Sequence, residues 1–485
     1  MTMNTVRYSN FRVLLISPPL SVVKQAGSLK DLANVLPTMG IGYIASLLLK
    51  HGFAVRLCDY IGAPKTLEGM LDDVASAAPN VIGITATILT ISTVNELAVA
   101  IKERFPAIPL VIGGPQLCSA PEKTMREGPY DLGVLGEGEE TMLELVRAMR
   151  DGSTELGDIR GLIIKRGGEL VRTSPRPYIQ DLDLLPFPAR HLYPPLSAYR
   201  PVPASYVKKP VGLMISSRGC PYQCIFCDRQ VFGNKFRANS AKYVVDEIEE
   251  VMRVHGAREI RFMDDTFTLD IKRVDAICEE IFKRKIKVPW TCLTRVNTVN
   301  LEILRKMKRA GCWQVIYGIE SGDQKMLDII KKGVTVEENE TGVRLAKKAG
   351  LNVRATFVFG FPGETLGSIK RTVDFAKRMD LDVVNFFTVI LYPGNELFLM
   401  AKREGKVLHE NYDEYTSLID TEETHLHYVP DGLTEKELKN AIVQAYRSYY
   451  FRPGYLLGRV VSIRSIEDVE RYWTAFRSLV SMRKV

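Results

Sequence analysis

The sequence predicts an α/β protein with two parallel β-sheets followed by a helical C-terminal region. Short apolar runs alternate with amphipathic segments over residues 11–152, and the same alternation resumes at Val211. After about Asn411 the pattern changes, and helical segments finish the chain. Alternation of this kind indicates parallel strands joined by crossover helices. A length of 485 residues also favours several domains.

The first alternating segment predicts a doubly wound, Rossmann-like domain over residues 1–152. Its helices begin with GIGYIASLLLKHG, which ends at Gly52, and the N-terminal apolar run is interpreted as a strand because two prolines cut it short. The predicted strands are FRVLLISPP, AVRLCDY, NVIGITAT, PLVIGG and DLGVLGEG. A connector over residues 153–210 follows, with a predicted hairpin at GLIIKRGGELVRT and a proline-rich run from Pro175.

The second alternating segment, residues 211–410, predicts a partial barrel of six strand–helix units. Its predicted strands are VGLMISS, EIRFMDD, VPWTCLTR, WQVIYGIES, NVRATFVFGF and DVVNFFTVILYP. Barrels of this class carry their chemistry at the carboxyl ends of the strands. A helical region over residues 411–485 completes the predicted organisation.

Composition limits the possible partners and compartments. A net charge of +8 is modest for this length and does not demand nucleic acid. No apolar stretch reaches the roughly 18 residues needed to span a bilayer, so membrane contact is expected to be peripheral at most. Eight cysteines in a long chain without a recognisable secretion signal do not suggest a disulfide framework. A cytoplasmic location is expected.

Three of the eight cysteines lie within eight residues, in ISSRGCPYQCIFCDRQ directly after the first barrel strand. Cys220, Cys224 and Cys227 have the spacing C-x3-C-x2-C. Three thiolates can bind three irons of a 4Fe–4S cluster, which leaves the fourth iron open for chemistry. The alternatives are a structural zinc site or buried thiols, but zinc usually takes four ligands and no fourth Cys or His lies nearby.

The cysteine spacing and the aromatic Phe226 before the third cysteine resemble the signature of the radical S-adenosylmethionine (SAM) superfamily. The resemblance extends through the whole predicted barrel. It implies that the open iron chelates SAM and that an electron from the cluster cleaves SAM to a 5′-deoxyadenosyl radical. An electron donor such as flavodoxin or ferredoxin is the implied partner.

The same resemblance assigns SAM contacts at the strand ends. In RFMDDTF, Asp264 and Asp265 correspond to the site for the SAM amino group, and Arg295 reaches the SAM carboxylate. Glu320 and Ser321 in YGIESGD resemble the ribose and carboxylate contacts. The alternatives are a solvated turn or helix cap for the aspartates and an ion pair for the glutamate.

Two further segments resemble the adenine site of the family. GFPGE, with Gly360 and Pro362, resembles the loop that lies along the adenine, although a simple turn is the alternative. The backbone of Ile390–Tyr392 resembles the strand that hydrogen-bonds the adenine.

The N-terminal domain carries small and glycine residues where its predicted strands end. Glycines there allow a bulky ligand to approach the backbone. These residues are Thr85, Thr87, Gly113, Gly114, Gly136, Glu137 and Gly138. The arrangement resembles the cobalamin-binding domains upstream of many radical SAM barrels. The loop SPPLSVVKQAG lacks the cobalt-ligating histidine of the Asp-x-His-x-x-Gly pattern, so ligation by histidine is not expected. The alternative is a domain kept for packing or for another ligand.

The C-terminal helices interleave tyrosines with arginines, and two interpretations are open for them. One is an amphipathic bundle that caps the barrel, and the other is a surface for an anionic or amphiphilic substrate or a membrane interface. The residues are Tyr446, Arg447, Tyr449, Tyr450, Phe451, Arg452, Tyr455, Arg459, Arg464, Arg471 and Arg477. His425 and His427 are interpreted as part of a surface strand, and the isolated cysteines as buried thiols.

The resulting functional prediction is a cobalamin-dependent radical SAM enzyme that modifies an unactivated carbon of a small-molecule substrate. Methylation is the leading outcome, with a lipid or a tetrapyrrole among the candidate substrates. One alternative keeps the cofactors but forms or rearranges carbon–carbon bonds, as in the anaerobic tetrapyrrole cyclase. Another is a cobalamin- or SAM-binding regulator without turnover. A methylthiotransferase is disfavoured, because no upstream cysteines for a second cluster are visible.

Overall fold

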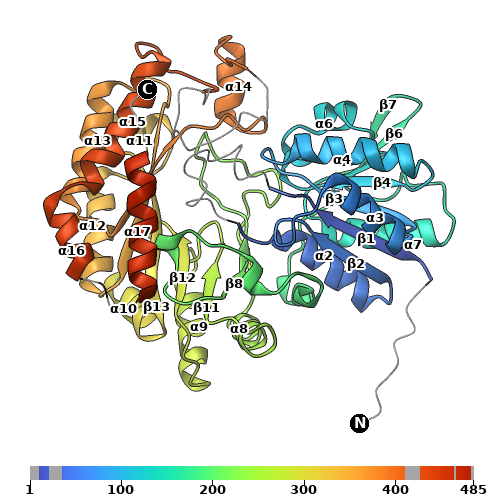
Figure 1. Cartoon of the computed structure of the whole chain (residues 1–485), viewed down its shortest axis with the longest axis horizontal. Helices are drawn as coiled ribbons and strands as arrows, with labels where there is room; N and C mark the ends of the chain where they lie inside the picture. Colours follow the sequence, from blue (N-terminus) through green and yellow to red (C-terminus); the bar gives the residue numbers. More distant parts are fainter. Residues whose placement is uncertain (1–9, 21–34, 410–425, 462, 464–465, 482–485) are drawn as a thin grey trace. The chain divides into compact units, whose positions relative to one another are not determined.

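A computed structural model describes residues 10–20, 35–409, 426–461, 463 and 466–481 (Figure 1). The chain divides into two compact units. The N-terminal unit contains Val35–Tyr199 and Asp228–Arg237, together with the first strand. The C-terminal unit contains Arg200–Cys227 and the chain from Ala238 onward. Each unit is described by itself.

The N-terminal unit is built on a seven-stranded sheet of order β2-β1-β3-β4-β5-β6-β7. Its strands are β1 (Arg12–Ser17), β2 (Ala54–Asp59), β3 (Val81–Thr85), β4 (Leu110–Gly113), β5 (Leu132–Val134), β6 (Leu162–Arg166) and β7 (Glu169–Arg172). The first five strands are parallel, and β6 and β7 form the predicted hairpin at the sheet edge. The strand order reverses at β1, as in a doubly wound fold.

Helices alternate with these strands because each carries an apolar stripe that packs on the sheet. They are α2 (Met39–Lys50), α3 (Leu67–Ala77), α4 (Ile91–Arg104), α5 (Pro115–Ser119), α6 (Pro121–Glu127) and α7 (Gly138–Arg150). Ile41, Ala45 and Leu48 of α2 recur at helical spacing and are fully or almost fully buried. The sequence-predicted fold of this unit is therefore confirmed.

Part of the proline-rich run packs on the N-terminal unit through two tyrosines. Tyr193 donates its hydroxyl to the Thr38 carbonyl at 2.6 Å, and its ring fills the space that a side chain at Gly42 would need. Tyr199 lies against Gly62 in the same way and donates to the carboxylate of Asp59. Short 3₁₀ turns support this run, namely η2 (Leu182–Leu184), η3 (Arg190–Leu192) and η4 (Leu196–Ala198).

The C-terminal unit is built on a six-stranded parallel sheet whose order follows the chain, β8-β11-β12-β13-β14-β15. The strands are β8 (Val211–Met214), β11 (Glu259–Phe262), β12 (Trp290–Thr294), β13 (Cys312–Glu320), β14 (Asn352–Phe359) and β15 (Val383–Thr388). The helices are α8 (Ala241–His255), α9 (Ile271–Lys283), α10 (Leu301–Arg309), α11 (Gln324–Ile329), α12 (Val336–Lys348), α13 (Leu366–Arg378) and α14 (Glu396–Arg403). The minor elements are η5 (Pro203–Ser205), β9 (Ser217–Arg218), β10 (Arg237–Ala238) and η6 (Val296–Thr298). The predicted six-unit partial barrel is confirmed.

The two faces of this sheet have different environments. Right-handed crossovers between successive parallel strands place the helices on one face. On β14, Val353, Ala355 and Phe357 face those helices and are fully buried. Thr356 and Val358 alternate with them and remain partly accessible. We call this second, partly accessible surface the inner face of the sheet.

The helical tail covers the free edge of β15 with tyrosine hydroxyls. The tail helices are α15 (Glu435–Tyr450), α16 (Pro453–Val461) and α17 (Ile466–Ser481). Tyr450 accepts from the Val384 N–H at 2.8 Å and donates to the Val384 carbonyl at 2.5 Å. Tyr446 accepts from the Phe386 N–H at 3.0 Å. These bonds replace the missing neighbouring strand and support the interpretation of the tail as a cap.

Removing one of these hydroxyls is expected to weaken the fold. Tyr450→Phe leaves the N–H and the carbonyl of Val384 without their partner, which costs about 1–3 kcal/mol where a buried group stays unpaired. Equilibrium unfolding in urea measures this loss. An unchanged midpoint would show that water replaces the hydroxyl at no cost.

The predictions for the histidines and for the isolated cysteines have different outcomes. His427 is 1% exposed and packs edge to face on His409, with ring centroids 4.5 Å apart, so its assignment to a surface strand is wrong. Burial lowers its pKa to about 3. The side chains of His425, Arg464 and Arg471 lie outside the described residues.

Four of the isolated cysteines are buried as predicted, namely Cys58, Cys278, Cys292 and Cys312. Among the described helices, none has the length and apolar character needed to cross a membrane.

Candidate active site

The loop after β8 presents the three cysteines of the C-x3-C-x2-C motif. Gly219 precedes them with a φ of +83°, a conformation that favours glycine. The Cys227 N–H donates to the Cys224 carbonyl at 3.2 Å, which folds the last four residues of the motif into a turn. Cys224 is buried, Cys220 is half-buried and Cys227 is exposed. All three thiols are free of disulfides.

Asp264, just beyond the end of β11, holds the start of this loop. Its carboxylate accepts three bonds, from the Ser216 N–H at 2.7 Å, the Ser216 hydroxyl at 2.7 Å and the Ser217 hydroxyl at 2.6 Å. Arg273 of α9 donates to the Ser216 hydroxyl and carbonyl from the other side. Because Asp264 is fully buried and its oxygens are engaged, it positions the loop rather than facing solvent.

Side chains from the ends of β11 and β12 contact the cysteine sulfurs. The Thr266 hydroxyl lies 3.8 Å from the Cys220 sulfur, and an Arg295 Nη lies 3.8 Å from the Cys224 sulfur. The Arg295 guanidinium also stacks 3.6 Å above the ring centre of Tyr222 and donates to the Lys332 carbonyl. Donors near cluster sulfurs are a known means of adjusting redox potential.

The middle of the motif is anchored to the ends of β14 and β15. The Leu397 N–H donates to the Ile225 carbonyl at 2.9 Å, and the Asn395 amide donates to the Phe226 carbonyl at 2.8 Å. The Phe226 ring packs against Phe361 of the GFPGE segment, with centroids 5.2 Å apart. The cysteine loop is therefore connected to four other strand ends of the barrel.

The three thiols can be compared with the ligands that a single metal ion and a cluster need. A mononuclear site needs all its sulfur ligands within about 2.3 Å of one point. Across the described residues, no three His, Cys, Asp or Glu side chains converge closely enough to hold one ion. A cubane distributes its thiolates over separate irons, so three cysteines spaced along one loop can serve it.

Glu320 ends β13 in a strained backbone conformation with a φ of +66°, at an irregularity in the pairing with β14. Its carboxylate accepts from the Lys332 ammonium at 2.9 Å, and both side chains are less than 10% exposed. The ion-pair alternative is thus realised. Sequence reasoning missed Lys332, because nothing local distinguishes it from the exposed Lys331 beside it.

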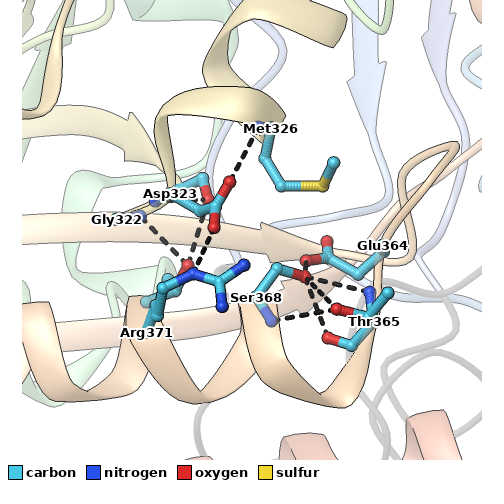
Figure 2. A network of polar contacts seen from close by, with 9 residues as sticks. Gly322, Asp323, Met326, Glu364, Thr365, Ser368 and Arg371 are labelled. Carbon is cyan, nitrogen blue, oxygen red and sulfur yellow. Dashed lines mark hydrogen bonds and ion pairs between the residues drawn. The ribbon is translucent and has the colours of Figure 1, made fainter.

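Helix α13 clamps the loops that follow β13 and β14 (Figure 2). Thr372 shares a hydrogen bond of 3.0 Å with Ser321 and accepts from the Gly322 N–H at 3.0 Å. Arg371 binds the carboxylate of Asp323 in the same loop. Figure 2 also shows the second clamp, in which Ser368 donates to Glu364 at 2.5 Å.

Glu364 closes the GFPGE segment and is 1% exposed. Burial raises its pKa from 4.5 to about 7, partly opposed by the Ser368 hydroxyl and backbone N–H groups. The folded chain thus holds this proton at pH values where the unfolded chain has released it, so this group makes stability fall as pH rises from about 4.5 to 7.

Glu364→Gln mimics the protonated acid and should abolish that pH dependence. At pH 8 the variant is expected to be more stable than the parent, by up to about 3 kcal/mol, and at pH 5 nearly equal to it. Thermal melts between pH 5 and 8 measure the difference. Glu302→Gln, on the exposed side of α10, is the control and should follow the parent. Parallel curves for Glu364→Gln and the parent would contradict the prediction.

The remaining predicted SAM contacts lie at the same edge of the sheet. Asp265 is exposed and accepts from the Gly219 N–H, while surrounding protein and the neighbouring Asp264 raise its pKa. Gly360 has a φ of +94°, and Pro362 and Tyr392 are partly accessible. Unlike Asp264, Asp265 therefore leaves its carboxylate available.

The N-terminal unit brings its predicted site residues to the carboxyl edge of β3, β4 and β5. Gly114 has a φ of +94°, and a side-chain carbon there would lie 2.6 Å from the Thr85 hydroxyl oxygen. Gly136 has a φ of +75°, and nothing lies within 4 Å of the corresponding position. Gly113 and Thr87 are partly accessible. Accessible backbone at this edge fits a flat, bulky ligand such as a corrin.

Glu137, unlike the glycines beside it, forms a buried ion pair. It binds Arg237 at 2.8 Å, and both side chains are 3% exposed. The carboxylate also accepts from the Ile179 N–H at 2.8 Å. Beside it, the Gly136 N–H donates to the Cys118 sulfur at 3.2 Å, and burial raises the pKa of that thiol to about 11. Gly138 lies against Ile44 of α2. Glu137 and Gly138 thus have structural roles of their own at this edge.

Known proteins share both halves of this arrangement. The model of the radical SAM superfamily matches residues 214–376, and the model of the B12 binding domain matches residues 29–146. An uncharacterized methyltransferase of Pyrococcus horikoshii is 34% identical over 92% of this chain and 94% of its own length. The anaerobic magnesium-protoporphyrin IX monomethyl ester cyclase of Cereibacter sphaeroides is 28% identical over 88% of this chain and 71% of its own.

A solved structure shares the fold over nearly the whole chain. The radical S-adenosylmethionine methyltransferase TsrM from Kitasatospora setae, with cobalamin and a [4Fe-4S] cluster bound, is similar with a TM-score of 0.71 and 20% identity. The match covers 97% of this chain and 99% of that one.

Fold and site together define a radical SAM enzyme with an attached B12 binding domain. The chain belongs to the radical SAM superfamily, in the group that carries this second domain. Its cofactors are a 4Fe–4S cluster, SAM and cobalamin, which confirms the sequence-based prediction.

Proposed function

We propose that this protein is a cobalamin-dependent radical SAM methyltransferase that acts on an unactivated carbon of a small molecule. The observation that carries the proposal is the cysteine loop, tied by hydrogen bonds and packing to four other strand ends of the barrel. The 34% identity to a protein described as a methyltransferase supports methyl transfer over other outcomes.

The residues at the strand ends divide into those that hold a cofactor and those that position them. Cys220, Cys224 and Cys227 would hold the cluster. Asp265, with its accessible carboxylate, suits the SAM ammonium group better than Asp264, whose oxygens already accept three bonds.

Arg295 and Glu320 have partners within the chain, and each keeps a part of its polar group for the cofactor. Arg295 presents its guanidinium between Cys224 and Tyr222, where it can also reach a carboxylate. Glu320 bonds Lys332 through one carboxylate oxygen, which leaves the other for a ribose hydroxyl. Ser321, Gly360, Pro362 and Tyr392 would border the rest of SAM.

Cobalamin would lie at the carboxyl edge of β3, β4 and β5. Thr85, Gly113, Gly114 and Gly136 expose backbone there, and Gly138 follows them at the start of α7. His51 follows α2 at the opposite end of the sheet, so it is not placed to ligate cobalt. The cofactors supply radical formation and the methyl group, while the chain excludes water and orients the substrate.

The products formed from SAM distinguish methyl transfer from its alternatives. The anaerobically reconstituted protein is incubated with reductant, cobalamin, methyl-deuterated SAM and candidate lipids or tetrapyrroles. Methyl transfer predicts both 5′-deoxyadenosine and S-adenosylhomocysteine, and the label in the product. 5′-Deoxyadenosine without S-adenosylhomocysteine would favour a cyclase, in line with the 28% identity to a magnesium-protoporphyrin cyclase. Absence of 5′-deoxyadenosine would refute catalysis and favour a regulator.

The reductant in the cell is proposed to be flavodoxin or ferredoxin. Either protein should replace the chemical reductant in the same assay. The outcome that would count against this proposal is SAM cleavage that depends on dithionite and responds to neither protein.

A further inference from the structure

Two arginines lie on the inner face of the six-stranded sheet, and neither belongs to the site described above. Arg261 of β11 is 3% exposed and Arg354 of β14 is 8% exposed. The strand register brings them to neighbouring levels, because Arg261 pairs with Thr291, Thr291 with Gln314, and Gln314 with Asn352. Arg354 lies two residues beyond Asn352, on the same face.

Arg261 has few partners for its five donors. One Nη donates to the Ser205 carbonyl, and its Nε is buried without a hydrogen-bond partner. The nearest acid, Glu259, is already engaged by the Val207 and Lys208 N–H groups and by the Trp313 indole, at 2.7, 2.8 and 3.0 Å. No direct ion pair therefore neutralises Arg261.

The positive charge of Arg354 has fewer compensating neighbours than that of Arg261. Its Nε donates to the Asn385 side chain at 3.0 Å, and its charged neighbour is Arg261. Within the described part of the chain, neither arginine forms a salt bridge with a carboxylate. Burial lowers the pKa of Arg354, and burial with the facing Arg354 lowers the pKa of Arg261 to about 10. Other buried arginines here have more partners, since Arg237 binds Glu137 and Arg273 binds two backbone carbonyls and the Ser216 hydroxyl.

Residues beside Arg354 on the inner face keep part of their surface exposed. Thr356 and Val358 follow Arg354 along β14 and are partly exposed, as are Asn385 and Phe387 on β15. The Tyr446 and Tyr450 side chains are buried close to Arg354 and, being neutral, do not balance its charge. A pair of guanidiniums without a bonded carboxylate is costly to bury, even with Glu259 near Arg261, and is stabilised by an incoming anion.

We propose that Arg261, Arg354 and Asn385 form a binding site for an anionic group of the substrate, a carboxylate or a phosphate-type oxyanion. The planar forks of two arginines match both groups, and the Asn385 amide adds a further donor. The site would fix the polar end of the substrate on the inner face of the sheet. The inference rests on the proposed function, whose substrate class it narrows to anionic molecules.

Anion binding by the full-length, cluster-loaded protein is the first test. Inorganic phosphate and, separately, acetate are titrated calorimetrically at an ionic strength held constant with KCl. We expect saturable binding of at least one anion and a loss of at least about tenfold in affinity for Arg354→Gln. The anion that binds more tightly, phosphate or acetate, identifies the class of anion that the site prefers. Arg344→Gln, 67% exposed on α12 and 4.0 Å from Glu340, is the matched control and should bind as the parent does.

Failure of saturation by both anions, or equal affinities for the Arg354→Gln and Arg344→Gln variants, would overturn the proposal. The titration requires no SAM cleavage. It can thus succeed or fail independently of the 5′-deoxyadenosine assay that tests the proposed function.

Stability in a buffer that contains neither phosphate nor a carboxylate is the second test, and a purely structural arginine would give the opposite result. In Tris-chloride buffer, Arg354→Met removes the charge but keeps most of the side-chain volume, so the melting temperature is expected to rise by about 2–4 °C. Phosphate or acetate, whichever binds, should stabilise the parent and leave Arg354→Met unchanged. A lower or equal melting temperature for Arg354→Met would identify Arg354 as a structural residue and refute the site.

Discussion

Cys224→Ser is expected to abolish SAM cleavage and to lower the iron content of the anaerobically reconstituted protein well below four per chain. Cys224 is the buried member of the motif, with its sulfur 3.8 Å from an Arg295 Nη and its carbonyl bonded to the Cys227 N–H. Serine keeps the backbone turn but provides no thiolate for iron. Because the radical depends on electron delivery from the cluster, 5′-deoxyadenosine should fall by at least about a thousandfold.

Cys278→Ala is the control for this variant. Cys278 is fully buried on α9 and lies outside the cysteine motif, so its loss should leave iron content and SAM cleavage near the parent values. Iron and sulfide analysis with quantification of 5′-deoxyadenosine measures both. A Cys224→Ser protein that retains four irons and cleaves SAM would remove this cysteine from the cluster.

Arg237→Met is expected to destabilise the N-terminal unit by about 3–5 kcal/mol. The variant leaves the Glu137 carboxylate buried without its guanidinium partner, and the Ile179 N–H that also bonds it carries no charge. An uncompensated buried charge of this kind is among the costliest single changes in a protein. It also removes the donor to the Ile179 and Phe232 carbonyls.

The double variant Glu137→Met and Arg237→Met should recover the part of this loss that comes from the unpaired carboxylate, because two apolar side chains need no charge compensation. Arg172→Met is the control, since Arg172 and Glu122 form a pair whose side chains are about half exposed, and such pairs contribute less than about 1 kcal/mol. Urea unfolding measures all three variants. Equal losses for Arg237→Met and Arg172→Met would contradict the assigned role of the buried pair.

The positions of the strands along the chain could be read from the sequence, because each parallel strand is a short apolar run between amphipathic helices. The register irregularity at Glu320 could not, since it depends on pairing between β13 and β14 and on a φ of +66°. The burial of His427 was missed for a related reason. Alternating residues in an extended segment indicate a surface strand only when nothing else packs on them, and His409 does.

The cysteine motif was the most predictable part of the site, because its ligands are contiguous in sequence. The partners of the acidic residues were not predictable. Asp264 bonds Ser216 and Ser217, and Glu320 bonds Lys332, over separations that only the folded barrel defines. The two inner-face arginines carried no local signal, since a strand arginine is ordinarily exposed.

The hydrogen bonds from Tyr446 and Tyr450 to β15 can form only late in the synthesis of the chain. Val384 and Phe386 leave the ribosome 66 and 60 residues ahead of the tyrosines that later bond to them. At about 5–20 residues per second, the last strand of the barrel waits roughly 3–13 s with its outer backbone groups unpaired. During that interval the nascent chain depends on solvent or chaperones to keep this strand from pairing with another chain, and α15 ends that dependence when it docks.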